Sequence, residues 1–418
     1  MRRIFSFVLT MILLSSNIVF ADNNKVILGN ERLISEYSHL INNKNIGVIT
    51  NQTGINSKGE NTYEVLYNYK KTNLKALYTP EHGLDGLTKA GKYIESSVHP
   101  KYNIPVYSLY GPNRMIAEHM LKDIDVLIFD IQDIGSRTYT YISTLNYSMI
   151  AAKKYNKKII VLDRPNPVGG HIVEGFTLEP KYKSFVGIDA MPMAHGMTVG
   201  EIAKFFNRNI DCDLQIITMK NYYRDMVYQD TNLPWKMTSP NIPDLDSAFG
   251  YMATGIGSGT GVGQGEKFKF IGSSAIKNSN EFANLLNSSS LEGVKFIPKT
   301  IGSRNGVALK ITDYKKFNPC KTGIYALTYA HKLTNFEVPK SKNNIIMFEK
   351  IIGTDKFGKL LESHTSPKEI VNSYQDDLNK FLKLRSKYLI YDYSNKNIDK
   401  ETTLNTVENK NHVDYLFE

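Results

Sequence analysis

Acidic side chains in constrained loops are the residues through which this chain could best carry out chemistry. Glu81 lies in the segment Thr-Pro-Glu-His-Gly at residues 79–83. Pro80 favours an extended chain before it, and Gly83 permits a tight turn after it. Glu81 and His82 would therefore sit on a rigid elbow. A carboxylate held in this way suits general acid catalysis or nucleophilic attack.

Glu174 is a second candidate acid. It follows the apolar residues Ile172 and Val173, so partial burial would favour its protonated form, as a general acid requires. The alternative is that Glu174 occupies a surface position on an edge strand, with no part in chemistry.

Further polar residues follow other apolar runs. Asp130 and Asp133 could bind a cation, act as acid and base, or orient Arg137, and arginine suits a two-point grip on a ligand carboxylate. The structural alternative is that Asp130 caps its turn and pairs with Arg137. His195, just before a helical segment, could be catalytic or structural. The remaining candidates offer donors and acceptors to hydroxyl groups, and they are Asn51, Asp163, Arg164 and Asn166.

Short apolar runs alternate with amphipathic stretches through the first half of the chain. Each run has the length of a strand buried on both faces, and the stretches between them have helical spacing. This alternation predicts right-handed βαβ units and a mainly parallel sheet, whose ligand crevice lies at the carboxyl ends of the strands. The expected strands are 46–49, 74–78, 105–109, 126–129, 159–162 and 214–218, and the expected helices are 62–69, 114–121, 141–155 and 198–207.

We predict an α/β protein in which a Rossmann-like domain, residues 22–225, precedes a smaller mixed α/β domain, residues 226–393, and a polar tail, residues 394–418. Apolar residues at helical spacing predict one helix over 367–389. The Gly-rich segment 255–265 is expected to be a loop bordering the cleft, because a dinucleotide site needs a strand before it and a helix after it. No cofactor is predicted. No metal site is predicted either, since the chain has no CxxC or HExxH pattern.

The first 21 residues have the pattern of a secretory signal. Arg2 and Arg3 precede an apolar run at 4–14, and Val-Phe-Ala ends the segment. The run is shorter than the roughly 20 residues that span a bilayer. We therefore expect cleavage after residue 21, a periplasmic or secreted product and no membrane insertion afterwards. In an oxidising compartment Cys212 and Cys320 could pair, or they could be two buried thiols.

The excess positive charge is diffuse. The chain of 418 residues has 51 basic and 41 acidic side chains, a net charge of +10. Its lysines lie beside asparagine or other lysines and are not clustered with arginine and aromatic residues. This distribution argues against nucleic-acid binding and is compatible with attraction to anionic cell-wall polymers. The sequence leaves the oligomeric state open.

Six sequence blocks follow one another along the chain. They are Asn-Gln-Thr-Gly at 51–54, Pro-Glu-His-Gly at 80–83, Phe-Asp-Ile-Gln-Asp-Ile-Gly-Ser-Arg-Thr-Tyr at 129–139, Asp-Arg-Pro-Asn-Pro at 163–167, Pro-Met-Ala-His-Gly-Met-Thr at 192–198 and Ser-Pro-Asn-Ile-Pro at 239–243. In order and spacing they resemble the signature blocks of the exo-β-N-acetylmuramidases, a glycoside hydrolase family. The resemblance covers nearly all of the mature chain. It implies release of N-acetylmuramic acid from the non-reducing end of peptidoglycan fragments, so the expected partners are peptidoglycan-derived saccharides or muropeptides.

The resemblance also implies roles for single residues. Glu81 matches the glutamate proposed as catalytic in the Glu-His-Gly motif of the family, and Glu174 falls where a second essential carboxylate is expected. Paired carboxyl groups are what glycoside hydrolysis uses. We expect Arg137 or Arg164 to bind the lactyl carboxylate of muramic acid. The ring hydroxyls and the acetamido group are assigned to Asn51, His82, Asp130 and Asn166, with Asp133, Asp163 and His195 completing the substrate-binding set.

One segment departs from the family pattern. Where the family has Glu-Gly-Thr-Asn and then Gly-Arg-Gly-Thr, this chain has Ser-Gly-Thr-Gly at 258–261 and Gly-Glu-Lys-Phe at 265–268. If these positions line the cleft, the departure affects substrate preference or turnover. The alternative function is a non-catalytic muropeptide-binding protein with the same cleft. A third hypothesis, a metal-dependent hydrolase, would use His82, Asp130, Asp133 and His195, but their spacing matches no known metal site.

Overall fold

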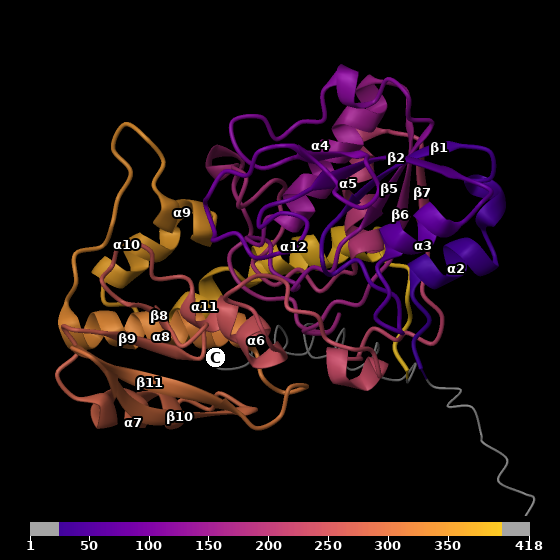
Figure 1. Ribbon diagram of the computed structural model, residues 1–418. Helices are drawn as coiled ribbons and strands as arrows, with labels where there is room; N and C mark the ends of the chain where they lie inside the picture. The colour runs from indigo at the N-terminus through magenta and orange to yellow at the C-terminus, as the bar shows by residue number, and fades with distance from the viewer. Residues whose placement is uncertain (1–24, 395–418) are drawn as a thin grey trace, which may run out of the picture.

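The computed structural model describes residues 25–394 and has two parts, each built on one sheet (Figure 1). The larger part is a seven-stranded sheet flanked by helices. The smaller part is a four-stranded antiparallel sheet packed against helices. This confirms the predicted fold class, a mainly parallel α/β unit followed by a smaller mixed one. The predicted signal segment, and the predicted polar tail except for Ser394, lie outside the described residues.

The large sheet has the strand order β3-β4-β2-β1-β5-β6-β7, and its neighbours are parallel except for β3 with β4. Without the edge strand β3, this is the order of a doubly wound nucleotide-binding fold. The six predicted strands are confirmed, whereas β3 was missed because its two exposed residues leave no apolar pattern. The strands are β1 (Asn45–Thr50), β2 (Asn73–Thr79), β3 (Ser97–Val98), β4 (Pro105–Ser108), β5 (Val126–Asp130), β6 (Lys158–Leu162) and β7 (Leu214–Ile217).

Helices cover both faces of the large sheet and account for the apolar character of its strands. Successive side chains of a strand point to opposite faces. In β5, Leu127 and Phe129 therefore face α4 (Tyr141–Lys154) and α5 (Val199–Ile210). Val126 and Ile128 join the core on the other face, which includes α2 (Gly29–Ser35) and α3 (Thr62–Asn68). Full burial of one such side chain stabilises the fold by about 1.5–3 kcal/mol.

Helix α5 begins where its sequence predicts. Thr198 Oγ1 accepts a hydrogen bond from the Glu201 N–H at 3.2 Å, and the Glu201 carboxylate accepts one from the Thr198 N–H at 3.0 Å. This reciprocal capping box satisfies two backbone donors that a helix start otherwise leaves without partners. The cap therefore fixes the start of α5 beside the carboxyl end of β6.

The predicted helix over 114–121 does not form. Only the single 3-10 turn η2 (Glu118–Met120) is helical in this segment. Ile116 and Leu121 are nevertheless both buried. The apolar spacing of this segment therefore reflects two core contacts of an irregular loop and not a helix.

The smaller part has the strand order β10-β11-β9-β8 and is antiparallel throughout. Its strands are β8 (Gly263–Gly265), β9 (Phe270–Ser273), β10 (Val294–Ile301) and β11 (Arg304–Ile311), and the helices that follow the large sheet are α6 (Leu245–Thr254), α7 (Ser279–Asn287), α8 (Pro319–Thr334), α9 (Met347–Ile352), α10 (Lys356–Glu362), α11 (Pro367–Ser373) and α12 (Gln375–Arg385). None of the helices within residues 25–394 is both long and apolar enough to cross a membrane.

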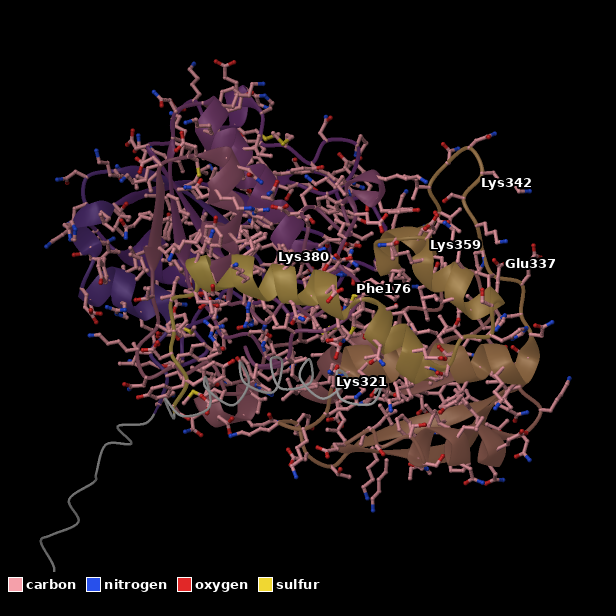
Figure 2. All side chains as sticks on the ribbon, turned by 180° about the vertical axis from the view of Figure 1, so that it is seen from behind. Phe176, Lys321, Glu337, Lys342, Lys359 and Lys380 are labelled. Atoms are coloured by element: carbon pink, nitrogen blue, oxygen red, sulfur yellow. The ribbon has the colours of Figure 1, made fainter. Side chains whose placement is uncertain are left out.

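The segment 367–389, predicted as one helix, forms two, α11 and α12. They meet at Tyr374, which is buried 4.7 Å from the ring of Phe176, the residue labelled between the two parts in Figure 2. Helix α11 packs on α8 in the smaller part, whereas Phe381 of α12 lies 5.8 Å from Phe205 of the larger part. The helix is interrupted because its two halves bury their apolar faces in different cores. The end of the chain thereby joins the two parts.

The two cysteines are free and buried in different hydrophobic cores. Cys212 lies in the core beneath α4 and α5, and Cys320 lies in the core of the smaller part. Of the two alternatives that the sequence left open, the structure therefore contains two buried thiols.

Candidate active site

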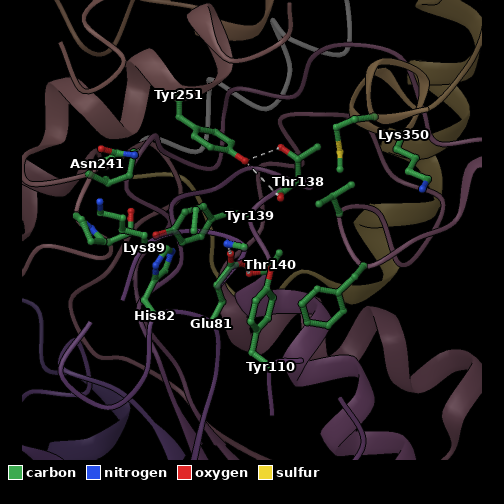
Figure 3. Close-up of a pocket in the computed structure, with 18 of the residues that line it drawn as sticks. Glu81, His82, Lys89, Tyr110, Thr138, Tyr139, Thr140, Asn241, Tyr251 and Lys350 are labelled. Carbon is green, nitrogen blue, oxygen red and sulfur yellow. Dashed lines mark hydrogen bonds between the residues drawn. The ribbon is translucent and has the colours of Figure 1, made fainter. Parts of the chain in front are cut away.

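A cavity of about 890 Å³ opens where the carboxyl ends of β2 and β4 meet the smaller part (Figure 3). Glu81 and His82 enter it from the loop after β2, and Tyr110 enters it after β4. The start of α4 and its preceding loop contribute Tyr139 and Thr140. The smaller part closes the cavity with side chains that include Tyr251, Phe268, Met347 and Lys350. A concave surface that combines aromatic side chains with fixed polar groups is typical of a small-molecule site.

Glu81 is held by both of its carboxylate oxygens. Its Oε1 accepts a hydrogen bond from the Gly91 N–H at 2.8 Å, and its Oε2 accepts one from Thr140 Oγ1 at 2.7 Å. Only 7% of the residue is exposed. The predicted elbow is present, because the Gly83 N–H donates to the Pro80 carbonyl. Each carboxylate oxygen accepts more than one hydrogen bond, so both remain able to meet a ligand in the cavity.

His82 has a defined proton arrangement. Its Nδ1 lies 2.6 Å from the Thr88 carbonyl oxygen, and a carbonyl can only accept, so Nδ1 carries the hydrogen. In the neutral ring this leaves Nε2 as an acceptor. His82 has a backbone φ of 73°, a conformation uncommon outside glycine. The turn that presents Glu81 therefore also presents His82 to the same cavity.

Tyr110 remains a hydrogen-bond donor at neutral pH. Burial, and after it the negative charge of Glu81, raise the pKa of the Tyr110 hydroxyl to about 12. Elsewhere in the cavity lining, the Tyr251 hydroxyl lies 3.3 Å from Thr138 Oγ1, and the Tyr139 hydroxyl donates to Thr238 Oγ1 at 3.0 Å. The hydroxyls around Glu81 are thus protonated and oriented by neighbours.

The cavity carries more positive than negative charge. Lys89, Arg114 and Lys350 line it, while Glu81 is the single carboxylate among the described residues that do so. None of the three cations forms a salt bridge within residues 25–394. A concave surface with unpaired charge of one sign attracts ligands of the opposite sign. The cavity therefore favours an anionic ligand.

Asn51, Asp130 and Arg164 lie elsewhere, at the crossover point between β1 and β5. Asp130 is fully buried, and its two oxygens lie 2.5 and 2.9 Å from Nε and Nη2 of Arg164. Asn51 Oδ1 accepts from the N–H and hydroxyl of Thr53. The crevice that the strand order predicts here is filled by this network. None of the three residues lines the cavity, and Asp130 pairs with Arg164, so the predicted pairing with Arg137 is wrong.

Arg137 joins the two parts of the protein. It is fully buried, and its Nη2 donates to the carbonyl oxygens of Ile351 and Ile352 at 2.8 and 3.0 Å. These carbonyls end α9 and have no partner within that helix. Burial lowers the pKa of Arg137 to about 10. The guanidinium that was expected to bind a ligand carboxylate is therefore used to hold the smaller part.

Asp163 and Asn166 also have structural partners. Asp163 accepts hydrogen bonds from the Gly200 N–H at 2.7 Å and the Tyr391 hydroxyl at 2.6 Å. Burial raises the pKa of Asp163 to about 7. Asn166 Nδ2 donates to the Met197 carbonyl at 3.1 Å. These contacts tie the start of α5 to the loop after β6, and neither side chain lines the cavity.

Glu174 has hydrogen-bond partners different from those of Glu81. Its carboxylate accepts hydrogen bonds from Asn318 Nδ2 at 2.9 Å and from the Gly175 N–H at 3.1 Å, and its backbone pairs with Ala194. Glu174 does not line the cavity that contains Glu81. The structure therefore does not bring the two predicted catalytic carboxylates to one cavity.

Asp133 and His195 form a buried pair outside the cavity. Asp133 Oδ2 accepts from the Gly135 N–H at 2.7 Å and lies 3.9 Å from His195 Nε2. Among the residues that the structure describes, Asp133 Oδ1 and His195 Nε2 have no hydrogen-bond partner. Burial raises the pKa of Asp133 to about 7 and lowers that of His195 to about 3. Within residues 25–394, no three side chains of His, Cys, Asp or Glu are grouped as metal ligands.

The raised pKa of Asp133 predicts a pH-dependent effect of Asp133→Asn. Between about pH 4 and pH 7 the folded protein keeps a proton that the unfolded chain, with its ordinary pKa of 3.8, has lost, so ionisation of Asp133 disfavours folding as the pH rises. Asparagine cannot ionise. The free energy of unfolding of the variant, relative to wild type, should therefore increase from pH 4 to pH 7 and stay level above that, as measured by urea unfolding. A difference independent of pH would contradict this.

Comparison with known proteins decides the family. Residues 46–246 match the model of the N-terminal domain of exo-beta-N-acetylmuramidase NamZ, and residues 249–391 match that of its C-terminal domain. The chain belongs to the NamZ family of exo-beta-N-acetylmuramidases. The peptidoglycan beta-N-acetylmuramidase NamZ of Bacillus subtilis (strain 168) is 41% identical over 388 residues, which cover 89% of this chain and 92% of that protein. The protein is therefore a glycosidase of the family that the sequence blocks indicated.

Two solved structures are similar to this NamZ family member. Both are crystal structures of DUF1343 family proteins from Bacteroides fragilis NCTC 9343. One has a TM-score of 0.80 at 32% identity, and the other has 0.69 at 28% identity. Each match covers 88% of this chain and all of the other. The two-part architecture is thus shared with solved relatives.

The segment that departs from the NamZ family pattern lies mostly away from the cavity. Within 255–268 only Phe268 lines it. Ser258 is partly buried elsewhere, and exposed Glu266 pairs with Lys299. Residues 263–265 form β8, which pairs with β9. A strand therefore follows the glycines, whereas a dinucleotide site needs a helix at that position. The Gly-rich segment was expected to border the cleft, and in the structure Phe268, just after it, is the residue of 255–268 that lines the cavity.

Several residues of the NamZ family cavity were missed by the sequence analysis. Thr140 directly follows one of the sequence blocks, and Tyr139 lies inside it, so the block could have indicated both. Arg114, Tyr251 and Lys350 come from a loop and two helices far apart in the chain. No local pattern distinguishes these three from ordinary surface residues.

Proposed function

We propose that this protein is an exo-acting glycoside hydrolase that releases N-acetylmuramic acid from the non-reducing end of peptidoglycan fragments, and that Glu81 is its catalytic acid. The observation that carries the proposal is the position of Glu81: a carboxylate fixed by two hydrogen bonds in a basic, aromatic cavity. The Bacillus subtilis relative, named as a peptidoglycan beta-N-acetylmuramidase, supports the substrate class.

In the proposed reaction Glu81 gives a proton to the glycosidic oxygen while the bond from that oxygen to C1 breaks. The departing fragment takes the proton as a hydroxyl group, water supplies the new oxygen at C1, and the proton that this water loses returns to the Glu81 carboxylate. Tyr110 donates toward Glu81, and Nε2 of His82 accepts a hydrogen bond from a sugar hydroxyl. The aromatic walls formed by Tyr139 and Tyr251 cover the apolar faces of the sugar ring.

A chromogenic β-glycoside of N-acetylmuramic acid tests this function. We expect the purified protein to release the chromophore, and to do so equally in the presence of a chelator, since the proposed chemistry needs no metal ion. Binding of the glycoside without release would instead support the non-catalytic muropeptide-binding alternative. Activity lost in chelator and restored by a divalent ion would support the metal-dependent hypothesis.

Thr140 is proposed as a positioning residue, because its hydroxyl holds Glu81 Oε2 at 2.7 Å. Thr140→Val keeps the shape of the side chain but removes this donor. We expect kcat to fall on the order of 10-fold, the value of one hydrogen bond to the carboxylate that Glu81 becomes as it gives up its proton, while KM changes little. Thr140→Ser should restore most of the loss. A change in KM alone, or no rescue by serine, would indicate a packing role.

We also propose that the protein acts outside the cytoplasm on muropeptides or larger peptidoglycan fragments. The sequence of residues 1–21 supports export. N-terminal sequencing of the protein recovered from cells should give a chain that begins near Asp22. An intact Met1 in the recovered protein would argue against export by signal cleavage.

A further inference from the structure

Arg114 differs from every other arginine in the described part of the chain. Residues 25–394 contain eight arginines. Seven of them donate hydrogen bonds to carboxylates or backbone carbonyls, and these are Arg32, Arg137, Arg164, Arg208, Arg224, Arg304 and Arg385. Within residues 25–394, Arg114 makes no hydrogen bond and no salt bridge, and its Nε is buried without a partner. Since a guanidinium has five N–H donors, this is an unusual position.

Aromatic rings hold the Arg114 guanidinium in place. Its Cζ lies 4.2 Å from the ring centre of Phe185 and 5.6 Å from that of Tyr110. Stacking of this kind orients the plane of the guanidinium and leaves its N–H edges free. The segment 114–121, where a helix was predicted, is largely irregular, and this allows Arg114 to reach the rings.

Arg114 faces the same cavity as Glu81. Its donors are therefore unpaired in a concave site whose wall carries two further unpaired cations, Lys89 and Lys350. A planar, oriented fork of donors matches the two oxygens of a carboxylate better than a flexible lysine does. The arrangement indicates that the cavity binds a ligand that carries a carboxylate.

The two sugars of peptidoglycan differ in this group. N-acetylmuramic acid carries a lactyl carboxylate, and N-acetylglucosamine has a hydroxyl at the same carbon. We propose that Arg114 binds the lactyl carboxylate of the sugar in the cavity and makes the site select muramic acid over glucosamine. This inference rests on the proposed function. It assigns to Arg114 the role first expected of Arg137 or Arg164, whose guanidinium groups are buried and bonded to other residues.

Esterification of the ligand provides the test. The substrates are the chromogenic glycoside of N-acetylmuramic acid and its lactyl methyl ester, which lacks the negative charge. For wild type we expect kcat/KM to be on the order of 100-fold higher for the acid than for the ester, from two charge-assisted hydrogen bonds. For Arg114→Gln the ratio should fall to about 1, and for Arg114→Lys it should be intermediate. Lys183→Gln, which removes an exposed cation two residues from Phe185 that does not line the cavity, is the control and should keep the ratio.

The same comparison can be made without turnover. Calorimetric binding of free N-acetylmuramic acid and its methyl ester to Glu81→Gln, with and without Arg114→Gln, measures the same preference. A protein that binds the acid through Arg114 but hydrolyses nothing would refute the proposed function and support the inference. Equal acid-to-ester ratios in wild type and Arg114→Gln would overturn the inference, and so would a ratio that falls as far in Lys183→Gln. Thermal unfolding shows that each variant is folded.

Discussion

Replacement of Glu81 by glutamine should lower the turnover of a muramic acid glycoside on the order of 100-fold or more, the usual contribution of a positioned general acid. Glutamine has the same shape, and its carbonyl oxygen can accept the hydrogen bond that the Gly91 N–H now gives to Oε1. The Thr140 hydroxyl can rotate to accept from the new amide. The variant should therefore fold and bind the sugar, and only proton transfer is lost.

Glu174→Gln is the matched comparison. Its carboxylate is held by Asn318 and the Gly175 N–H, outside the cavity of Glu81. The structure therefore predicts a much smaller loss of kcat for this variant than for Glu81→Gln. An equal loss in a variant with unchanged stability would show that Glu174 reaches the substrate, as the paired carboxylates of the sequence analysis require. Wild-type rates in Glu81→Gln would refute the assignment of the acid.

The second large effect is expected at the crossover point between β1 and β5. Asp130→Ala leaves the Arg164 guanidinium, 3% exposed, without its carboxylate. Removal of one partner of a buried ion pair costs about 3–5 kcal/mol. We expect a decrease of this size in the free energy of unfolding measured with urea, with the loss of activity following the loss of folded protein.

A double replacement separates the structural role from a binding role. In Asp130→Leu/Arg164→Met both charges are removed, so the double variant should be more stable than either single variant. If Asp130→Ala instead unfolds like wild type and weakens sugar binding, Asp130 belongs to the substrate-binding set after all. Stability and binding measured on the same preparations distinguish these results.

The fold was largely predictable because its central strands are buried on both faces. Runs such as 126–129 and 159–162 contain almost no polar residue, and burial alone requires that pattern. The misses have a shared cause. Apolar spacing reports burial, and residues 114–121 and 367–389 bury side chains without forming the single helices that the spacing suggested. Strand β3 has no such pattern to detect.

The candidate site was predicted only where the signal is local. Pro80 and Gly83 define an elbow by their own backbone preferences, so Glu81 could be found from five consecutive residues. Asp130 and Arg164 could not be assigned in this way. A polar residue at a strand end has the same sequence pattern whether it binds a ligand or forms a buried ion pair. Only the packing of the smaller part decides which position along the carboxyl edge of the sheet remains open. That packing joins residues more than 200 positions apart, such as Arg137 and Ile351.

A crystal structure of Glu81→Gln with a bound muramic acid glycoside would show where the sugar binds relative to residue 81 and Arg114. The ligand should lie in the 890 Å³ cavity, with its glycosidic oxygen within hydrogen-bonding distance of the residue 81 amide and its lactyl carboxylate on the Arg114 guanidinium. A ligand bound instead at the crossover point beside Asp130 and Arg164, or against Glu174, would contradict the roles proposed for Glu81 and Arg114.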